Sequence, residues 1–282
     1  MAGAAGGTGR PASYVLGHSD WEMERLVVQA RLVDPITRRF FTAAGIVPGM
    51  HVLDAGSGVG DVSFLLAGMV GERGSVTGVE RVAAALDTAR ARARTIGVSN
   101  ATFVEGELSG VRLGRTFDAL AGRYILMFQP DPAAVLRNLA SHVKPGGIVV
   151  FHEPDWDGAR STPPVATYDL CCRWIVDTLI GTNTEHLMGA KLPATFASAG
   201  LPTPRMHLES FVGAGANAPD EIRLITDIVR TVLPEMERLG IVKPGQVDPG
   251  TLADRVRDEL VAARGVVVGR SEVGAWTRTP TP

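Results

Sequence analysis

The chain has 282 residues, of which 45% are hydrophobic and 21% charged, and its formal net charge is −2. This composition is ordinary for a folded globular protein, and the length allows one large domain with additions or two small domains. The near-neutral charge gives no reason to expect nucleic acid or an anionic membrane as a partner, and no apolar run is long enough to cross a bilayer.

The first 13 residues are rich in glycine and alanine and lack the apolar core of a signal peptide. We therefore expect residues 1–13 to form a disordered tail rather than a targeting segment. Between residues 14 and 47, apolar residues recur at helical spacing, which predicts one or two helices before the first strand.

After Pro48 and Gly49 the chain alternates between short apolar runs and amphipathic segments. Strands are predicted at 50–55, 75–80, 101–105, 117–124 and 148–153, and helices at 61–70, 82–96 and 132–142. This alternation predicts a parallel, doubly wound α/β sheet, and the near-continuous apolar runs indicate strands that are covered on both faces.

The alternation ends after Glu153. Residues 155–187 read as an insertion with one helix at 165–179. The later segments predicted are a helix at 191–199, a strand at 205–212, helices near 219–239 and 250–264, and a last strand containing 273–277. The only cysteines, Cys171 and Cys172, are adjacent, so neither a disulfide nor a metal site is expected, and buried thiols in a reducing cytoplasm are the simpler interpretation.

The most informative stretch runs from Val52 to Gly60, where a predicted strand ends and Gly56, Gly58 and Gly60 follow at alternate positions. Glycines allow a tight turn whose backbone can approach a ligand, and the helix that follows presents free N–H groups. The spacing differs from the dinucleotide pattern G-x-G-x-x-G, because Asp61 occupies the last glycine position. The Asp54 carboxylate would repel a pyrophosphate and would suit an amino group.

This stretch resembles motif I of the class I S-adenosylmethionine (SAM) dependent methyltransferases. The resemblance implies SAM as cofactor and the Rossmann-like seven-stranded sheet of that family, with strand order 3-2-1-4-5-7-6. It divides the chain into N-terminal lid helices at 14–47, a SAM-binding core at 48–154, a cap insertion at 155–187, and a remainder of the core at 188–282 with a helical insertion at 213–265.

An acidic residue, Glu80, ends the second predicted strand, beside the glycine turn in a doubly wound sheet. At that place a carboxylate can accept both ribose hydroxyls of an adenosine ligand, although a solvated loop glutamate is the alternative. The neighbouring Arg81 could hold a 2′-phosphate, so NADP remains an alternative ligand. In the resembled family an acidic residue after the third strand binds the adenine amino group, and Glu107, next to Leu108, takes that position; a helix cap or solvated side chain is the alternative.

The fourth strand ends in Gly122, Arg123 and Tyr124, at the edge of the sheet where ligands of parallel sheets bind. Arg123 could pair with the methionine carboxylate, or it could be an arginine that reaches from a strand end to solvent. In the resembled family a tyrosine of the lid covers the cofactor, and Tyr14 fits that role. The complete set of expected cofactor-binding residues is Tyr14, Asp54, Ala55, Gly56, Ser57, Gly58, Gly60, Glu80, Arg81, Glu107, Leu108, Gly122 and Arg123; no metal ligand is expected.

Methyl transfer needs an aligned nucleophile and often a base. The candidates are His152 and Glu153 at the end of the fifth strand and His186 in the insertion. Because side chains alternate along a strand, His152 and Glu153 cannot point the same way. Each could equally be a strand-end hydrogen-bond anchor, and His186 a surface histidine.

We interpret the chain as a methyltransferase for a small, largely apolar acceptor, with O-methylation in secondary metabolism as the leading chemistry and a homodimer as one possible assembly. Carbon or nitrogen methylation stays open, as does a SAM-binding protein or cyclase that transfers no methyl group. An NAD(P)-dependent oxidoreductase is a further alternative. The absent last glycine, the early Asp54 and the lack of a Tyr-x-x-x-Lys pair after strand four or five count against it.

Overall fold

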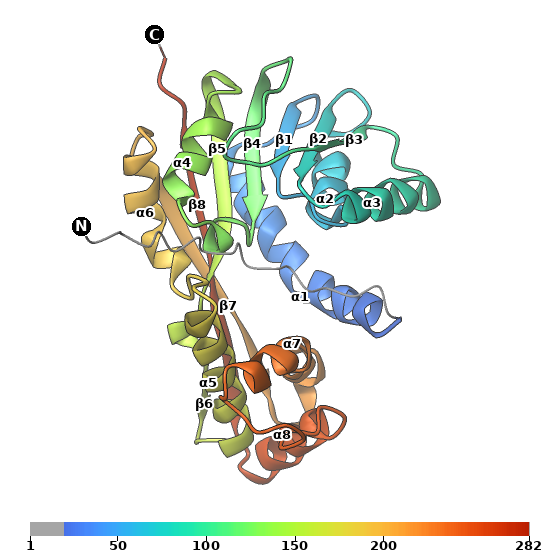
Figure 1. Ribbon diagram of the computed structural model, residues 1–282, viewed down its shortest axis with the longest axis vertical. Coiled ribbons are helices and arrows are strands. Elements are labelled where there is room, and N and C mark those ends of the chain that lie inside the picture. Colours follow the sequence, from blue (N-terminus) through green and yellow to red (C-terminus); the bar gives the residue numbers. More distant parts are fainter. Residues whose placement is uncertain (1–19, 282) are drawn as a thin grey trace, which may run out of the picture.

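The structure is a computed structural model that describes the backbone of residues 20–281 and the side chains from residue 29 to residue 281. Its upper part is an α/β sandwich and its lower part a group of helices, joined by two long strands (Figure 1). The predicted tail and the predicted lid residue Tyr14 lie outside the described residues.

Five parallel strands form the first part of the sheet, in the order β3-β2-β1-β4-β5. They are β1 (His51–Ala55), β2 (Ser75–Glu80), β3 (Ala101–Glu105), β4 (Phe117–Arg123) and β5 (Val143–Asp155). The connecting helices are α2 (Asp61–Val70), α3 (Ala83–Ile96) and α4 (Pro132–Ala140). The predicted parallel, doubly wound sheet is confirmed, and so are these helices.

Two antiparallel strands complete the sheet, because β8 (Val266–Arg278) pairs with β5 on one side and with β7 (Arg205–Ala214) on the other. The predicted order 3-2-1-4-5-7-6 counts the last two long strands as six and seven, and these are β7 and β8 in the structure. The observed order β3-β2-β1-β4-β5-β8-β7 therefore matches the prediction. The sheet has eight strands rather than seven, since β6 (Arg160–Thr162) pairs with the start of β8. Three residues are too few to show an alternating pattern, so the sequence does not reveal this strand.

Apolar residues of the parallel strands β1, β2, β4 and β5 are covered on both faces, as the continuous runs predict. One buried cluster joins the sheet to α4 and α6 (Met188–Ser198), and another joins it to α2 and the end of α1 (Asp20–Ala44). Leu53 and Leu120 belong to the first cluster and Val52 and Ala119 to the second, so neighbouring residues of one strand face opposite layers.

A second hydrophobic core lies beyond the carboxyl ends of the parallel strands. It is formed by α5 (Ala166–Gly181), α7 (Pro219–Arg238) and α8 (Leu252–Ala262), which gather below the sheet in Figure 1. Both cysteines are buried there, and burial raises their thiol pKa values. We call these three helices the cap.

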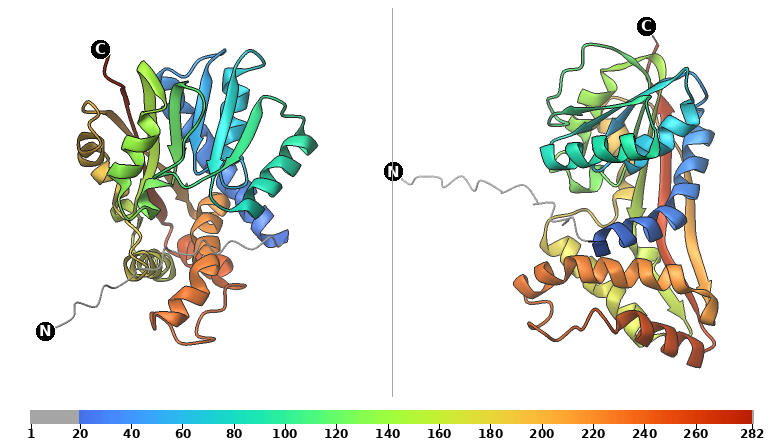
Figure 2. Two further views of the ribbon diagram at one scale, coloured as in Figure 1. Left: turned by 45° about the horizontal axis from the view of Figure 1, so that its top comes forward. Right: turned by 90° about the vertical axis from the view of Figure 1, so that its right-hand side faces the viewer.

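The N-terminal segment forms one long helix, α1, where the sequence allowed one or two. Its buried residues Val33 and Phe40 pack against the sheet, and its exposed arginines pair with Asp220 of α7 and Glu209 of β7. Figure 2 shows α7 running beside the first half of α1. Among residues 20–281, no helix combines the length and the apolarity that a membrane span requires.

Candidate functional site

The turn between β1 and α2 is built on glycine, with φ of 67° at Gly56, 51° at Gly58 and 99° at Gly60. These are left-handed conformations that residues with a Cβ rarely adopt. The turn is docked on β2, because the Ser57 N–H donates to the carbonyl of Val79 at 3.0 Å. Ala55 and Ser57 are buried beneath it.

Two of these glycines differ in what surrounds them. A Cβ at Gly56 would lie 2.3 Å from Cδ1 of Ile125, so Gly56 permits close packing against the chain that follows β4. A Cβ at Gly58 would meet no atom within 4 Å. The Gly58 backbone therefore borders open space, as a turn that lies flat against a ligand requires.

Glu80 closes β2 beside this turn, where the sequence places it. Its Oε2 accepts a hydrogen bond of 3.2 Å from the Gly58 N–H, and its Oε1 accepts bonds from the N–H groups of Arg81 and Val82 at 2.8 and 2.9 Å. The glycine turn and the acidic strand end thus form one hydrogen-bonded unit.

Asp54 lies buried under the glycine turn with one oxygen unpaired. Its Oδ2 accepts a bond of 2.5 Å from the Ser63 hydroxyl, whereas its Oδ1 has no partner among the described residues. Burial raises the pKa of Asp54 to about 7, although the Ser63 hydrogen bond and the Arg123 charge oppose this. A buried carboxylate with a free acceptor fits the ammonium group of an amino-acid ligand.

Arg123 ends β4 and is held by α1. Its Nη1 donates to Asp34 Oδ1 at 2.6 Å and to Thr37 Oγ1 at 3.0 Å, and only 4% of its side chain is exposed. Burial opposes its charge, but Asp34 together with Tyr124 and Asp61 more than offsets this, so the pKa of Arg123 is raised. The structure thus places a buried, permanently charged cation at this strand end.

The other expected cofactor residues divide into exposed and buried positions. Glu107 is 67% exposed and its Oε1 lies 4.0 Å from Nη1 of Arg81, while Leu108 is part of the hydrophobic core. A Cβ at Gly122 would lie 2.5 Å from the Phe151 ring, so this glycine serves packing within the sheet. The structure therefore groups residues 54–60 with Glu80 and Arg123, and leaves Glu107 in solvent.

Glu153, proposed from sequence as catalytic, is fully buried and turned toward the backbone. Its carboxylate accepts hydrogen bonds from the N–H groups of Ile125, Leu126 and Met127 at 3.0, 2.8 and 3.4 Å. Burial raises its pKa to about 7, and these three bonds oppose the rise. This geometry is that of the strand-end anchor, the alternative that the sequence left open.

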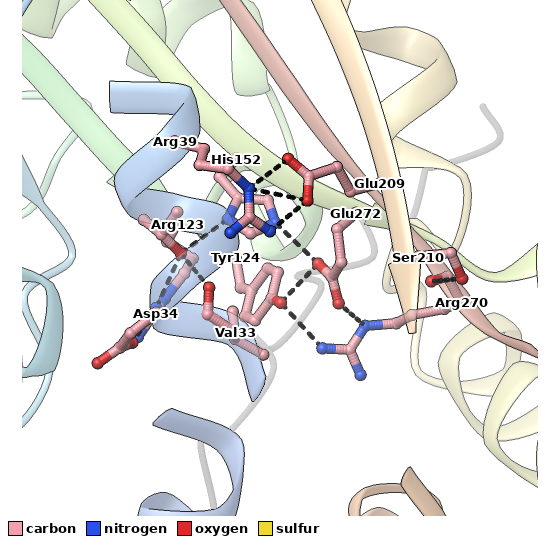
Figure 3. A network of polar contacts seen from close by, with 11 residues as sticks. Val33, Asp34, Arg39, Arg123, Tyr124, His152, Glu209, Ser210, Arg270 and Glu272 are labelled. Atoms are coloured by element: carbon pink, nitrogen blue, oxygen red, sulfur yellow. Dashed lines mark hydrogen bonds and ion pairs between the residues drawn. The ribbon is translucent and has the colours of Figure 1, made fainter. Parts of the chain in front are cut away.

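His152 is also fully buried, on the opposite face of β5. Its Nδ1 lies 3.0 Å from Thr37 Oγ1 and its Nε2 lies 2.8 Å from Glu272 Oε2 (Figure 3). Burial lowers its pKa, so the ring is neutral. With both ring nitrogens engaged, His152 offers no free atom to a substrate.

Sequence reasoning missed the other members of this polar network, the buried Thr37, Arg270 and Glu272 and the partly exposed Asp34. Glu272 Oε2 also accepts a 2.6 Å bond from the Tyr124 hydroxyl, and its Oε1 pairs with Arg270 Nε at 2.9 Å. The signal that could have found this pair is Arg-Ser-Glu at 270–272, two opposite charges in an otherwise apolar run. Asp34 and Thr37 look like ordinary polar positions of an amphipathic helix.

His186, the third catalytic candidate, keeps 22% of its side chain exposed. Its segment connects two strand ends, because the Trp156 N–H donates to the carbonyl of His186 and the Glu185 N–H donates to that of Met127. Its Nδ1 lies 4.0 Å from Glu185 Oε1. Over the part of the chain that the structure describes, no group of histidine, cysteine or acidic residues could hold a metal ion.

The known proteins that this chain resembles are methyltransferases. A family model described as a methyltransferase domain matches residues 46–192. The chain is 34% identical over 119 residues to an arsenite methyltransferase of Aquipseudomonas alcaligenes, across 39% of this chain and 34% of that protein. It is 32% identical over 122 residues to an aklanonic acid methyltransferase of a Streptomyces species, across 43% of this chain and 55% of that protein.

The matched region thus spans between a third and about half of the length of these curated relatives. A solved structure of a SAM dependent methyltransferase from Aquifex aeolicus resembles this one with a TM-score of 0.51 at 19% identity, covering 69% of this chain and 92% of that one. At that identity the structural likeness shows the fold.

Proposed function

The chain belongs to the class I SAM-dependent methyltransferases, and from that premise we propose that it transfers the methyl group of SAM to a small, largely apolar acceptor. The observation that carries the proposal is the hydrogen bond between Gly58 and Glu80 beside open space. It joins a flat backbone surface to a carboxylate that can accept ribose hydroxyls.

The residues around this bond fit the groups of SAM. Glu80 would hold the ribose, the unpaired Oδ1 of Asp54 the ammonium group, and Arg123 the methionine carboxylate. When bound, SAM supplies a methyl group on a positively charged sulfur, which is open to displacement by a nucleophile. The unpaired buried Oδ1 of Asp54 is the closest match, since a buried carboxylate oxygen without a partner is otherwise costly.

The acceptor would lie between the strand ends and the cap. Aromatic side chains of this region, Trp156 and Trp174, pack with the apolar residues of the cap, which supports an apolar acceptor. We propose an oxygen nucleophile and a place in secondary metabolism. The aklanonic acid methyltransferase among the relatives supports this choice by its name. Carbon and nitrogen acceptors are the alternative outcomes of the assay below.

His186 is the proposed general base for the acceptor hydroxyl. It is the only one of the three catalytic candidates whose side chain retains exposure, so an acceptor hydroxyl could reach its ring. Both His152 and Glu153 are already saturated with hydrogen bonds. A His186→Asn variant should lose turnover and keep its affinity for SAM.

The test is incubation with methyl-labelled SAM and a panel of phenols, carboxylic acids, amines and arsenite. We expect S-adenosylhomocysteine and one labelled methyl ether or ester to form in equal amounts. A protein that binds SAM yet yields no S-adenosylhomocysteine with any class of acceptor would instead be a SAM-binding protein or cyclase, and the proposal would fail.

A further inference from the structure

The chain turns sharply after β4, and we call residues 123–127 the β4 turn. Tyr124 has a φ of 55°, in the left-handed region that favours glycine. An aromatic residue adopts this conformation only where its surroundings impose it, and such residues cluster at functional sites. The surroundings that impose it here are two buried carboxylates.

The first carboxylate is Glu272 of β8, which has no exposed surface. It accepts a hydrogen bond from the Tyr124 hydroxyl, and the same hydroxyl accepts a bond of 2.9 Å from Arg270 Nη2. The Arg270 guanidinium also lies 5.0 Å from the centre of the Tyr124 ring (Figure 3). Burial opposes ionisation of Glu272, but the charge of Arg270 and the hydrogen bonds from His152 and Tyr124 more than offset it, so its pKa is lowered and it is a carboxylate at neutral pH.

The second carboxylate is Glu153 of β5, on the other face of the sheet. Its three backbone hydrogen bonds fix Ile125, Leu126 and Met127, the residues directly after Tyr124. The Tyr124 N–H donates in turn to the carbonyl of His152. The β4 turn is therefore held from two strands, through a side chain on one face and through the backbone on the other.

The residues fixed in this way border the SAM site. Arg123 immediately precedes Tyr124, and the Ile125 side chain fills the space beside Gly56 in the glycine turn. A shift of the β4 turn would move both the cation and the wall of the glycine turn. Apolar side chains would fill the same volume at lower cost in desolvation, so stability alone does not account for two buried carboxylates.

We propose that Glu153 and Glu272 are positioning residues for SAM, which hold the β4 turn so that Arg123 and Ile125 face the cofactor. This inference rests on the proposed function. Neither carboxylate touches the reacting atoms. Glu272 acts through the Tyr124 hydroxyl, and Glu153 acts through the backbone of the turn.

The first test compares Tyr124→Phe with a matched control, Tyr168→Phe. Tyr168 is a buried cap residue whose hydroxyl donates to the carbonyl of Val268, so each substitution removes one hydrogen-bonded hydroxyl and keeps the ring. We expect Tyr124→Phe to weaken SAM binding about tenfold in calorimetry, as loss of a bond to a charged acceptor predicts. The control should bind like the wild type at a similar melting temperature.

Wild-type affinity in Tyr124→Phe, or equal losses in both variants, would overturn the proposal. Glu272→Gln keeps an acceptor for the Tyr124 hydroxyl and Glu272→Ala does not, so the glutamine variant should retain more SAM affinity than the alanine variant. If either fails to fold, the tyrosine pair decides the question.

Amide hydrogen exchange separates this inference from the proposed function. The amides of Ile125, Leu126 and Met127 should exchange faster in Tyr124→Phe than in the wild type, with or without SAM, and should be unchanged in Tyr168→Phe. If the wild type binds no SAM, the proposed function fails. If it binds SAM and these amides exchange equally in all three proteins, the positioning role fails alone.

Discussion

The backbone N–H of Gly58 donates a hydrogen bond of 3.2 Å to Oε2 of Glu80, which joins the glycine turn after β1 to the carboxyl end of β2. This contact holds the donor-rich turn and the acceptor carboxylate next to each other before any ligand arrives. Binding then requires little reorganisation of either element, and preorganisation of this kind favours affinity.

Gly58→Ala should lower SAM affinity at least about tenfold, because its Cβ would enter the space that borders the turn. The matched control is Gly97→Ala at the end of α3, which also has a positive φ, 74°, and no atom near its Cβ. Both variants should lose similar stability from the left-handed backbone. Calorimetry with SAM would contradict the ligand position if the two variants bound equally well.

Glu80→Ala should weaken SAM binding by about 1–3 kcal/mol through loss of charged hydrogen bonds. The comparison is Glu107→Ala, whose exposed side chain should contribute less than that because water competes for it. Titration calorimetry of both variants decides between the two acidic positions. A larger effect at Glu107 would mean that the adenosine lies further toward β3 than we infer.

SAM affinity should depend on pH through Asp54. Its pKa is about 7, and an ammonium group binds the ionised form, so affinity should fall by up to tenfold per unit below pH 7. Above pH 7 the affinity should stay level until the ammonium group of SAM itself loses its proton, at about pH 8. Glu153 has a pKa in the same range, so the comparison with Asp54→Asn is essential. The asparagine variant should lose most of this slope, and an unchanged slope would assign the titration to another group.

The same pKa shift acts on stability with a definite sign. The folded pKa of Asp54 lies above its value of about 3.9 in an unfolded chain, so its contribution is full below about pH 4 and is lost as pH rises to about 7. Asp54→Asn should therefore be more stable than the wild type above pH 7 in chemical denaturation. Lower stability there would show that the carboxylate is needed by the fold.

Arg123 and Asp34 give opposite expectations for SAM binding. Arg123→Gln removes the cation for the methionine carboxylate and should weaken binding, whereas Asp34→Asn removes the anion that competes for it and should preserve or strengthen binding. Both substitutions disturb the same partly buried ion pair, so both should lower the melting temperature. Equal losses of SAM affinity would make Arg123 a purely structural partner of α1.

The sheet and the glycine turn could be predicted from sequence because their signals are local. Strands buried on both faces are continuous apolar runs, and positive φ angles in a turn require glycine, as at Gly56. The limits of β2 and α2 follow the predicted ones residue by residue. Glu80 could be placed for the same reason, since it follows directly from the end of a recognised strand.

The polar network could not be predicted because its contacts join residues far apart in the chain. His152 and Glu272 are separated by 120 residues, and the antiparallel register of β5 and β8 brings their side chains together. Alternation correctly indicates that His152 and Glu153 point to opposite faces. Alternation cannot show that both side chains are fully buried, because their burial depends on α1 and on the β4 turn.

The proposed function depends above all on SAM lying across Gly58 with its ribose at Glu80. The most direct measurement is titration calorimetry of the wild-type protein with SAM and, separately, with NADPH. We predict saturable binding of one SAM per chain, reduced in Gly58→Ala and in Glu80→Ala, and no heat from NADPH. Binding of NADPH in place of SAM, or SAM binding that neither substitution changes, would contradict it.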